Sequence, residues 1–328
     1  LDPLLFAPRR ERDSLLISRE PAKAAMDIER HSKVDASRYQ SFCALAKNLS
    51  AFLRTLYGMP LPDKANPGSF HPAELLKMGL KFHRLGEKEM YEFLRILPMS
   101  TADLMNEWFE NDLLKAALAA SGMLASFVGP RQQGTAFHML HHQLGESNGA
   151  LRVAGFVRGG IGNLTQALAR AAQQGGAEIR TDAEVANIIT QNRAATGVVL
   201  PNGDEISAAS VISSADVKRT FLKLLEPTYI DPHFLLQVQH IRARGTVAKI
   251  NLALDALPKF KNSTDQTALG GIIHIGPTLD YLEHPADDAK YGRFSNQPFL
   301  EIAIPSIADS SLAPAGKHVM SVWMQSAP

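Results

Sequence analysis

The sequence has one cysteine, no long apolar run and almost no net charge, and each shortage excludes a class of protein. Cys43 has no second cysteine with which to form an internal disulfide, and its apolar surroundings, YQSFCALAKNL, indicate a small packed side chain in a reducing, cytoplasmic compartment. No run of about 18 apolar residues occurs, so no transmembrane segment is expected. The 34 Lys and Arg balance 33 Asp and Glu, so we expect no nucleic-acid partner.

Both ends of the sequence indicate a piece of a longer chain. The sequence begins at Leu1 and passes at once through an apolar stretch, LDPLLFAP, and it stops just after HVMSVWM, whose alternation predicts a strand. A hydrophobic strand needs cover and hydrogen-bonded neighbours. We therefore expect further chain on both sides, and we expect exposed sheet edges to favour a homodimer.

Residues 1–148 carry a helical pattern. Apolar residues recur at spacings of three and four, as in Leu45, Leu49, Phe52 and Leu56. Pro60 and Pro62 predict the end of that helix, and Ser100 before TADLMNEWF predicts a helix N-cap. The segment therefore predicts a helical lobe with the size of a small domain.

The pattern changes at residue 149. After the glycine-rich VAGFVRGGIG, residues 163–174 predict a helix that Gly175 and Gly176 terminate. Short strands then follow in AEIRT, EVANIIT, TGVVL and EISAASVISS, with turns at 191–193 and 202–203, and the series ends in an apolar strand from Ser210 to Ser214. This succession predicts part of a doubly wound sheet, over residues 149–225.

Residues 226–328 are rich in predicted strands. GTVAKINLAL alternates along its length, and GGIIHIG, PFLEIAIP and HVMSVWM follow it. These segments predict a mostly antiparallel sheet. The fold class is therefore a mixture of α+β and α/β.

Several ordered stretches together resemble one enzyme family. These are GGIGNLTQALARAAQQGGAEIRTDAEVANI, ATGVVLPNGDEISAASVISSAD and GTVAKINLALDALPKF. In them the sequence resembles the phytoene dehydrogenase-like branch of the FAD-dependent amine oxidase superfamily, which includes the pyridine nucleotide-disulfide oxidoreductase domain-containing proteins. The resemblance covers most of the chain, from LDPLLFAP through HHQLGE to the last strand.

The resemblance implies a discontinuous FAD-binding domain, of which residues 149–225 are the second piece. In the family, an N-terminal Rossmann unit carries the GxGxxG loop that holds the FAD pyrophosphate, and this sequence contains no such unit. Residues 1–148 and 226–328 resemble the two parts of the substrate domain. We expect this chain alone to bind FAD weakly or not at all.

The resemblance also assigns cofactor-binding residues. Gly159, Gly160 and Gly162 match the family's glycine turn, where the backbone approaches the cofactor or a paired strand, although any tight strand-to-helix turn would use glycines too. Val185 matches a position whose main chain contacts the adenine. The strand end that reaches the dinucleotide site is matched by Ser213, Ser214 and Ala215.

Lys249 is the candidate catalytic residue. In VAKINLAL it aligns with a strand lysine that faces flavin N5 through a water in amine oxidases. A lysine on an alternating strand also marks a solvated face. In an apolar pocket, desolvation would lower its pKa and make proton transfer feasible.

Three histidines in FHMLHHQLGE, namely His138, His141 and His142, have the spacing of one helix face. A metal site would need a further ligand and supporting groups, and Glu146 is better explained as a helical partner of His142, so we expect no metal. The family carries a similar stretch, which implies that His141 and His142 line or brace the substrate lobe.

The function implied is transfer of hydride from a C–C or C–N bond to flavin N5. The substrate is a small apolar molecule or an amine, and the sequence does not choose between them. A non-catalytic binding or scaffold protein on the same fold is the alternative. A deep apolar cleft that converges on Gly160, Val185 and Lys249 would favour the enzyme.

Overall fold

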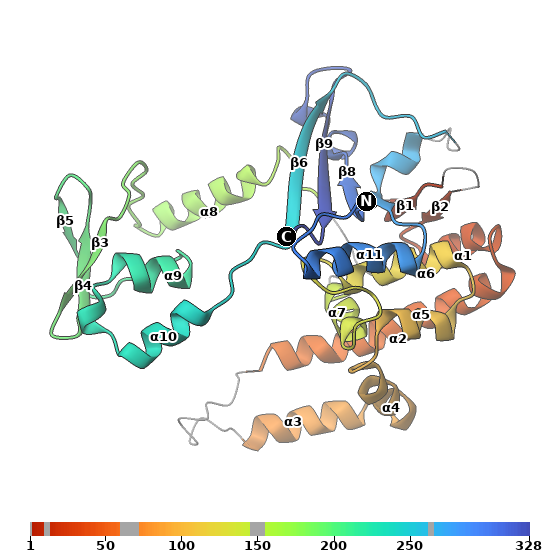
Figure 1. Cartoon of the computed structure of the whole chain (residues 1–328), viewed down its shortest axis with the longest axis horizontal. Helices are drawn as coiled ribbons and strands as arrows, with labels where there is room; N and C mark the ends of the chain where they lie inside the picture. The colour runs from red at the N-terminus through yellow and green to blue at the C-terminus, as the bar shows by residue number, and fades with distance from the viewer. Residues whose placement is uncertain (1, 10–13, 60–71, 145–154, 262–265) are drawn as a thin grey trace. The chain divides into compact units, whose positions relative to one another are not determined.

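The computed structural model describes residues 2–9, 14–59, 72–144, 155–261 and 266–328 (Figure 1). The chain divides into two compact units: the larger contains residues 1–163 and 245–328, and the smaller contains residues 164–244. Helices and sheets occur together, so the predicted mixed fold is confirmed. None of the helices in the described ranges has the length and apolar composition needed to span a bilayer.

A six-stranded sheet forms the centre of the larger unit, in the order β2-β1-β7-β8-β9-β6. Its strands are β1 (Leu5–Ala7), β2 (Leu15–Ile17), β6 (Val247–Leu254), β7 (Ile272–Ile275), β8 (Leu300–Ala303) and β9 (His318–Gln325). Every neighbouring pair is antiparallel except β1 and β7, which are parallel. The predicted antiparallel sheet therefore forms, and two strands from the N-terminal segment extend it.

Helices from the first half of the chain form a helical layer on one face of this sheet; the first and sixth of them contact the strands, and the third and fourth pack on the second. They are α1 (Pro21–Glu29), α2 (Lys33–Tyr57), α3 (Pro72–His83), α4 (Glu87–Ile96), α5 (Thr101–Trp108), α6 (Asp112–Ala119), the short 3-10 turn η2 (Ala120–Gly122) and α7 (Thr135–His142). Leu5 and Ile17 of the sheet share one hydrophobic core with Leu49 and Phe52 of α2. The apolar stripe that predicted α2 therefore faces the core.

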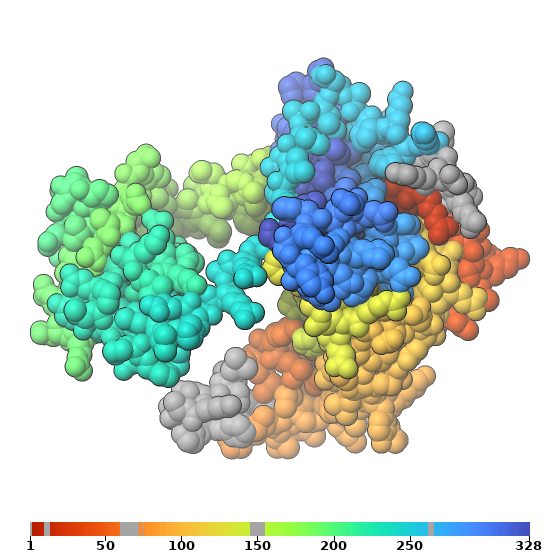
Figure 2. Space-filling model, in the orientation of Figure 1, coloured from red at the N-terminus to blue at the C-terminus, as the bar shows by residue number. Residues whose placement is uncertain are grey.

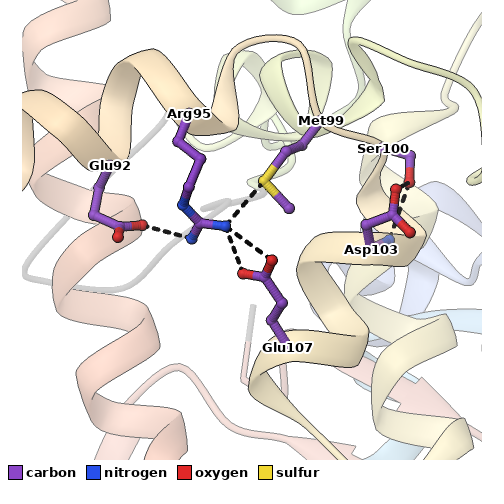
Figure 3. A network of polar contacts seen from close by, with 6 residues as sticks. All are labelled: Glu92, Arg95, Met99, Ser100, Asp103 and Glu107. Carbon is purple, nitrogen blue, oxygen red and sulfur yellow. Dashed lines mark hydrogen bonds and ion pairs between the residues drawn. The ribbon is translucent and has the colours of Figure 1, made fainter.

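The predicted N-cap of α5 is confirmed. The Ser100 hydroxyl accepts a hydrogen bond from the Asp103 backbone N–H at 3.0 Å and donates one to the Asp103 carboxylate at 2.7 Å (Figure 3). Beside it, the Arg95 guanidinium donates to both carboxylate oxygens of Glu107, at 2.9 and 2.7 Å, and to Glu92 at 2.7 Å. The two bonds to Glu107 connect α4 to α5.

The opposite face of the sheet has a smaller core. Phe6 and Ile273 pack with Ile304 and with residues of η5 (Gln266–Gly270), near α12 (Pro305–Ala308) and η6 (Ser310–Leu312). Helix α11 (Leu279–Lys290) joins the main core through Leu279 and Leu282. In Figure 2 the blue segment that carries α11 forms part of the surface of the larger unit. The sheet is therefore covered on both faces over its β1-β7-β8 part.

The smaller unit contains a three-stranded antiparallel sheet and short helices. The strands are β3 (Asn187–Gln191), β4 (Ala194–Val199) and β5 (Glu205–Ser207); the helices are most of α8 (Gly162–Gln174), α9 (Val217–Arg219), η3 (Thr220–Leu224), η4 (Pro227–Tyr229) and α10 (Pro232–His240). Asn192 and Arg193 both have positive φ, at 51° and 65°, which forms the tight turn predicted between β3 and β4. The predicted hairpin unit therefore forms.

Two predicted strands of this unit are wrong. Residues 177–181 and 210–214 have no strand assignment, and Ile212 is 96% exposed. A strand requires a hydrogen-bonded neighbour, and within the described residues neither segment belongs to a sheet. The composition of these two segments therefore predicted strands that do not form, because strand pairing depends on which residues lie beside the segment.

Candidate functional site

A row of four side chains crosses the large sheet on one face. His274 of β7 lies directly opposite Glu301 of β8, Glu301 lies opposite Trp323 of β9, and Trp323 lies opposite Lys249 of β6. Directly opposed residues on neighbouring strands point to the same face of a sheet. Strand pairing therefore brings an imidazole, a carboxyl group, an indole and an ammonium together from four separate parts of the sequence.

Burial decreases along this row. His274 is 2% exposed and packs edge to face on Phe299, with its Nε2 atom 3.8 Å from the Glu301 carboxylate. Trp323 is 43% exposed, and Lys249 is exposed. The Lys249 ammonium lies 5.5 Å from the centre of the Trp323 ring, within the range of a cation–π interaction. The row therefore runs from the interior to an open surface.

A cavity of about 130 Å³ lies at the buried end of the row, between the sheet and the helices. Its walls are mostly apolar and come from β1, β2, β7, α2, α6 and α7; Glu301 is the residue that the cavity shares with the row. The polar groups on the lining include Arg19, Tyr39, Cys43 and Gln143. An apolar hollow with a few polar groups is the usual form of a small-molecule site.

The glycine turn precedes α8 in the larger unit. Gly159 and Gly160 have φ values of +75° and +89°, which side chains with a Cβ rarely adopt, so these two positions require glycine. Gly162 has no such φ, and a Cβ there would meet open space. The turn itself therefore explains two of the three glycines.

The protein's own acceptors take up the N–H groups of this turn. The Gly159 N–H donates to the Asp309 carboxylate, and the Gly160 N–H donates to the Val157 carbonyl at 2.9 Å. Hydrogen bonds from the Ser311 hydroxyl and from the Gly159 N–H lower the pKa of Asp309, so it is a carboxylate at neutral pH. A phosphate would find both N–H groups occupied beside a negative charge. The turn fits a close backbone approach and does not fit a phosphate cradle.

The other predicted cofactor residues belong to the smaller unit. Val185 is half-buried in the loop before β3, where the neighbouring Ala186 N–H donates to the Val199 carbonyl at 2.8 Å. The Ser213 hydroxyl lies 2.8 Å from the hydroxyl of Thr220, which also donates to the Ala215 carbonyl at 3.4 Å. Ser214 is exposed, and Ala215 is half-buried. Residues 213–215 therefore lie in a loop that is hydrogen-bonded to Thr220 of η3, and Val185 lies in a separate loop.

The histidines of α7 do not line the cavity. His141 is exposed and its Nδ1 atom lies 3.0 Å from the Tyr57 hydroxyl, while the Nδ1 atom of His138 lies 2.9 Å from the Gly122 carbonyl. His142 is half-buried; its ring is tilted relative to the His138 ring and lies edge to face with the His141 ring. From this helix segment it is Met139 and Gln143 that reach the cavity. In the part of the chain that the structure describes, no cluster of His, Cys, Asp and Glu could hold a metal.

Sequence reasoning missed Glu301, Gln143 and Asp309. Glu301 is the one charged residue in the apolar strand PFLEIAIP, and that isolated charge was a usable signal. Gln143 and Asp309 carry no comparable signal, because polar residues after a helix are ordinary. Their importance comes from contacts with distant segments.

Comparison with known proteins identifies the family. The model of flavin containing amine oxidoreductases matches residues 27–327. Pyridine nucleotide-disulfide oxidoreductase domain-containing protein 2 of Rattus norvegicus is 30% identical over 329 residues, which cover 96% of this chain and 57% of the rat protein. The chloroplastic prolycopene isomerase of Daucus carota is 30% identical over 179 residues, 51% of this chain and 25% of that protein.

Among solved structures, an oxidoreductase from Methanosarcina mazei matches with a TM-score of 0.49 and 18% identity, over 82% of this chain and 59% of that one. The chain spans less than two thirds of the length of the rat relative. The family model, in contrast, covers nearly the whole chain. The chain therefore belongs to the family of flavin-containing amine oxidoreductases.

Proposed function

We propose that this chain forms the substrate-binding part of an FAD-dependent oxidoreductase that takes hydride from a C–C or C–N bond of an apolar or amine substrate. The observation that carries the proposal is the row from the cavity to Lys249, because it links an apolar binding site to the residue that resembles a catalytic lysine. When bound, FAD would supply the hydride acceptor at N5.

The cavity would hold the apolar part of the substrate. Leu5, Phe42 and Ile272 contribute apolar walls that exclude water. An engineered apolar cavity of about 150 Å³ accommodates benzene, so 130 Å³ suits one ring or a short branched hydrocarbon end. A longer substrate would extend beyond this cavity, and the cavity would fix the position of one end.

Lys249 would hold or move a proton at its Nζ atom. The cation–π contact with Trp323 holds the ammonium on the exposed part of the sheet face. Glu301 reaches the cavity from this same face. This placement supports the role that the family resemblance implies. Val185, Ser213, Ser214, Ala215 and the glycine turn at 159–162 remain the proposed cofactor contacts.

An absorbance spectrum tests the cofactor proposal. We expect the 328-residue chain mixed with FAD to show little bound flavin, and a protein of the relatives' full length to carry it, with absorbance over roughly 300–550 nm. Under anaerobic conditions, addition of a substrate should then bleach that absorbance. Stoichiometric flavin on this chain alone would contradict the expected weak binding.

A binding or scaffold protein on the same fold is the second candidate. The exposure of Lys249 favours it, since a solvated lysine on a strand needs no catalytic role. In that case neither this chain nor the longer protein would take up flavin, even with FAD added. That result would exclude the oxidoreductase.

A further inference from the structure

We propose that the cavity between the sheet and the helices selects a neutral apolar molecule with one hydrogen-bond donor, an alcohol or a phenol, and that Gln143 accepts that hydrogen bond. The inference rests on the proposed function, which places the substrate in this cavity. It goes further because it chooses among hydrocarbon, alcohol and charged amine.

Gln143 provides an acceptor that no described residue uses. It directly follows α7, is only 7% exposed and lines the cavity. Its side-chain Oε1 atom has no hydrogen-bond partner among the described residues. A buried carbonyl oxygen without a donor is unfavourable, so a ligand that brings an O–H group gains an interaction that a hydrocarbon cannot make.

Three neighbouring donors on the lining already have partners within the protein. The Tyr39 hydroxyl and the Cys43 thiol form a hydrogen bond with each other, and the Ser121 hydroxyl donates to the Leu118 carbonyl at 3.0 Å. Burial raises the pKa of the Cys43 thiol to about 11, so the group is uncharged at neutral pH. Within the described ranges, the cavity therefore offers a ligand an acceptor that lacks a donor, and no thiolate.

The charges on the lining disfavour a protonated amine. Arg19 and Glu301 both line the cavity, so their formal charges cancel, and the Glu301 carboxylate also faces His274 at 3.8 Å. An ammonium would lose its hydration in this site without gaining a net opposite charge. A neutral hydroxyl loses much less hydration and still pairs with Gln143.

Matched probes test this selectivity on the 328-residue chain without flavin. Phenol and benzene differ by one hydroxyl, and benzyl alcohol and benzylammonium differ by charge. The ¹³C-methyl NMR signal of Met139, which lines the cavity, reports binding, and Met139→Leu assigns it. We expect benzyl alcohol to shift this signal and benzylammonium to bind at least tenfold more weakly.

The decisive comparison is the ratio of the phenol and benzene dissociation constants. Gln143→Leu should weaken phenol about tenfold relative to benzene, while Gln237→Leu, at an exposed position of the smaller unit, should leave the ratio unchanged. Gln143→Met keeps the unbranched length and serves as a second variant if Gln143→Leu fails to fold. An unchanged ratio, or tighter binding of benzylammonium than of benzyl alcohol, overturns the proposal.

These outcomes are independent of the proposed oxidoreductase activity, because no flavin takes part in the measurement. Selective binding of phenol together with no flavin uptake by the longer protein would reject the enzyme and keep the alcohol-selective cavity. Flavin bleaching by a hydrocarbon, with no effect of Gln143→Leu, would keep the oxidoreductase and reject the alcohol-selective cavity.

Discussion

The Lys249 ammonium lies 5.5 Å from the centre of the Trp323 ring, its direct neighbour across the β6-β9 pair. The indole is a large planar surface on a central strand, and the lysine belongs to an edge strand of the sheet. The contact therefore limits where a long, flexible side chain can place its charge. An ammonium held in one region of the sheet face is better positioned for proton transfer than one free in solvent.

Replacement of Lys249 should separate binding from chemistry. We expect Lys249→Met to slow flavin reduction in the flavin-loaded protein by at least about 100-fold, as loss of a proton-transferring group does. Binding of phenol should not change, because Lys249 does not line the cavity. Stopped-flow absorbance without oxygen measures the reduction rate, and Met139 NMR measures binding.

Lys317 provides the matched control for this substitution. Its exposed ammonium lies 2.6 Å from the exposed Asp255 carboxylate, away from the row. Lys317→Met should leave the reduction rate unchanged. Equal rates in Lys249→Met and the unmodified protein would remove Lys249 from the proposed mechanism.

Local patterns predicted the features that depend on neighbouring residues. The apolar spacing of α2, the Ser100 cap and the turn at 192–193 all arise within a few residues, and all three form. The strand predicted at residues 210–214 does not form, because a strand needs a hydrogen-bonded neighbour. The candidate site could be predicted only in part, because the alignment of Glu301 with Trp323 and Lys249 depends on register between distant segments.

Asp35 supports the helical layer from within. This fully buried carboxylate accepts the Glu110 and Asn111 backbone N–H groups, both at 2.8 Å, just before α6 begins. Asp35→Ala would leave both donors without this acceptor, so we expect the free energy of unfolding to fall by about 3 kcal/mol. Urea denaturation followed by circular dichroism measures the change.

An exposed aspartate of the same layer serves as the comparison for Asp35. Asp112 forms an ion pair with Lys115 at 2.9 Å, and its side chain is mostly exposed. Asp112→Ala should therefore cost less than about 1 kcal/mol. If the two variants lost similar stability, the two buried hydrogen bonds of Asp35 would not be a major source of stability.

The glycine turn makes a prediction that does not depend on FAD. A Cβ at Gly160 would meet only the Leu312 side chain, at an ordinary 3.6 Å, so the cost of Gly160→Ala comes from its φ of +89°. We expect a loss of about 1–2 kcal/mol in the free energy of unfolding. Gly162→Ala, at the start of α8 with open space around its Cβ, should be neutral or slightly stabilising. Equal losses would refute the conformational explanation.

Burial of Cys43 makes stability depend on pH above neutrality. Desolvation raises the pKa of the thiol from its ordinary 9.0 to about 11, so the native state holds the proton more tightly than the unfolded state does. The resulting stability is complete below pH 9 and is lost as the pH rises toward 11. Between pH 8 and pH 10 the free energy of unfolding should fall by roughly 1.4 kcal/mol from this group.

Cys43→Ala isolates this contribution. The pKa of Tyr39 is also raised by burial, so its phenol lowers stability at high pH in the same direction, and the variant keeps that phenol. Urea denaturation at pH 8, 9 and 10 should give a steeper fall for the unmodified chain than for Cys43→Ala. The variant also loses packing at every pH, so the slopes are compared and not the absolute values. Parallel slopes would mean that the thiol titrates equally in both states and is reached by water, in which case the cavity could not be the neutral, apolar site that alcohol selectivity requires.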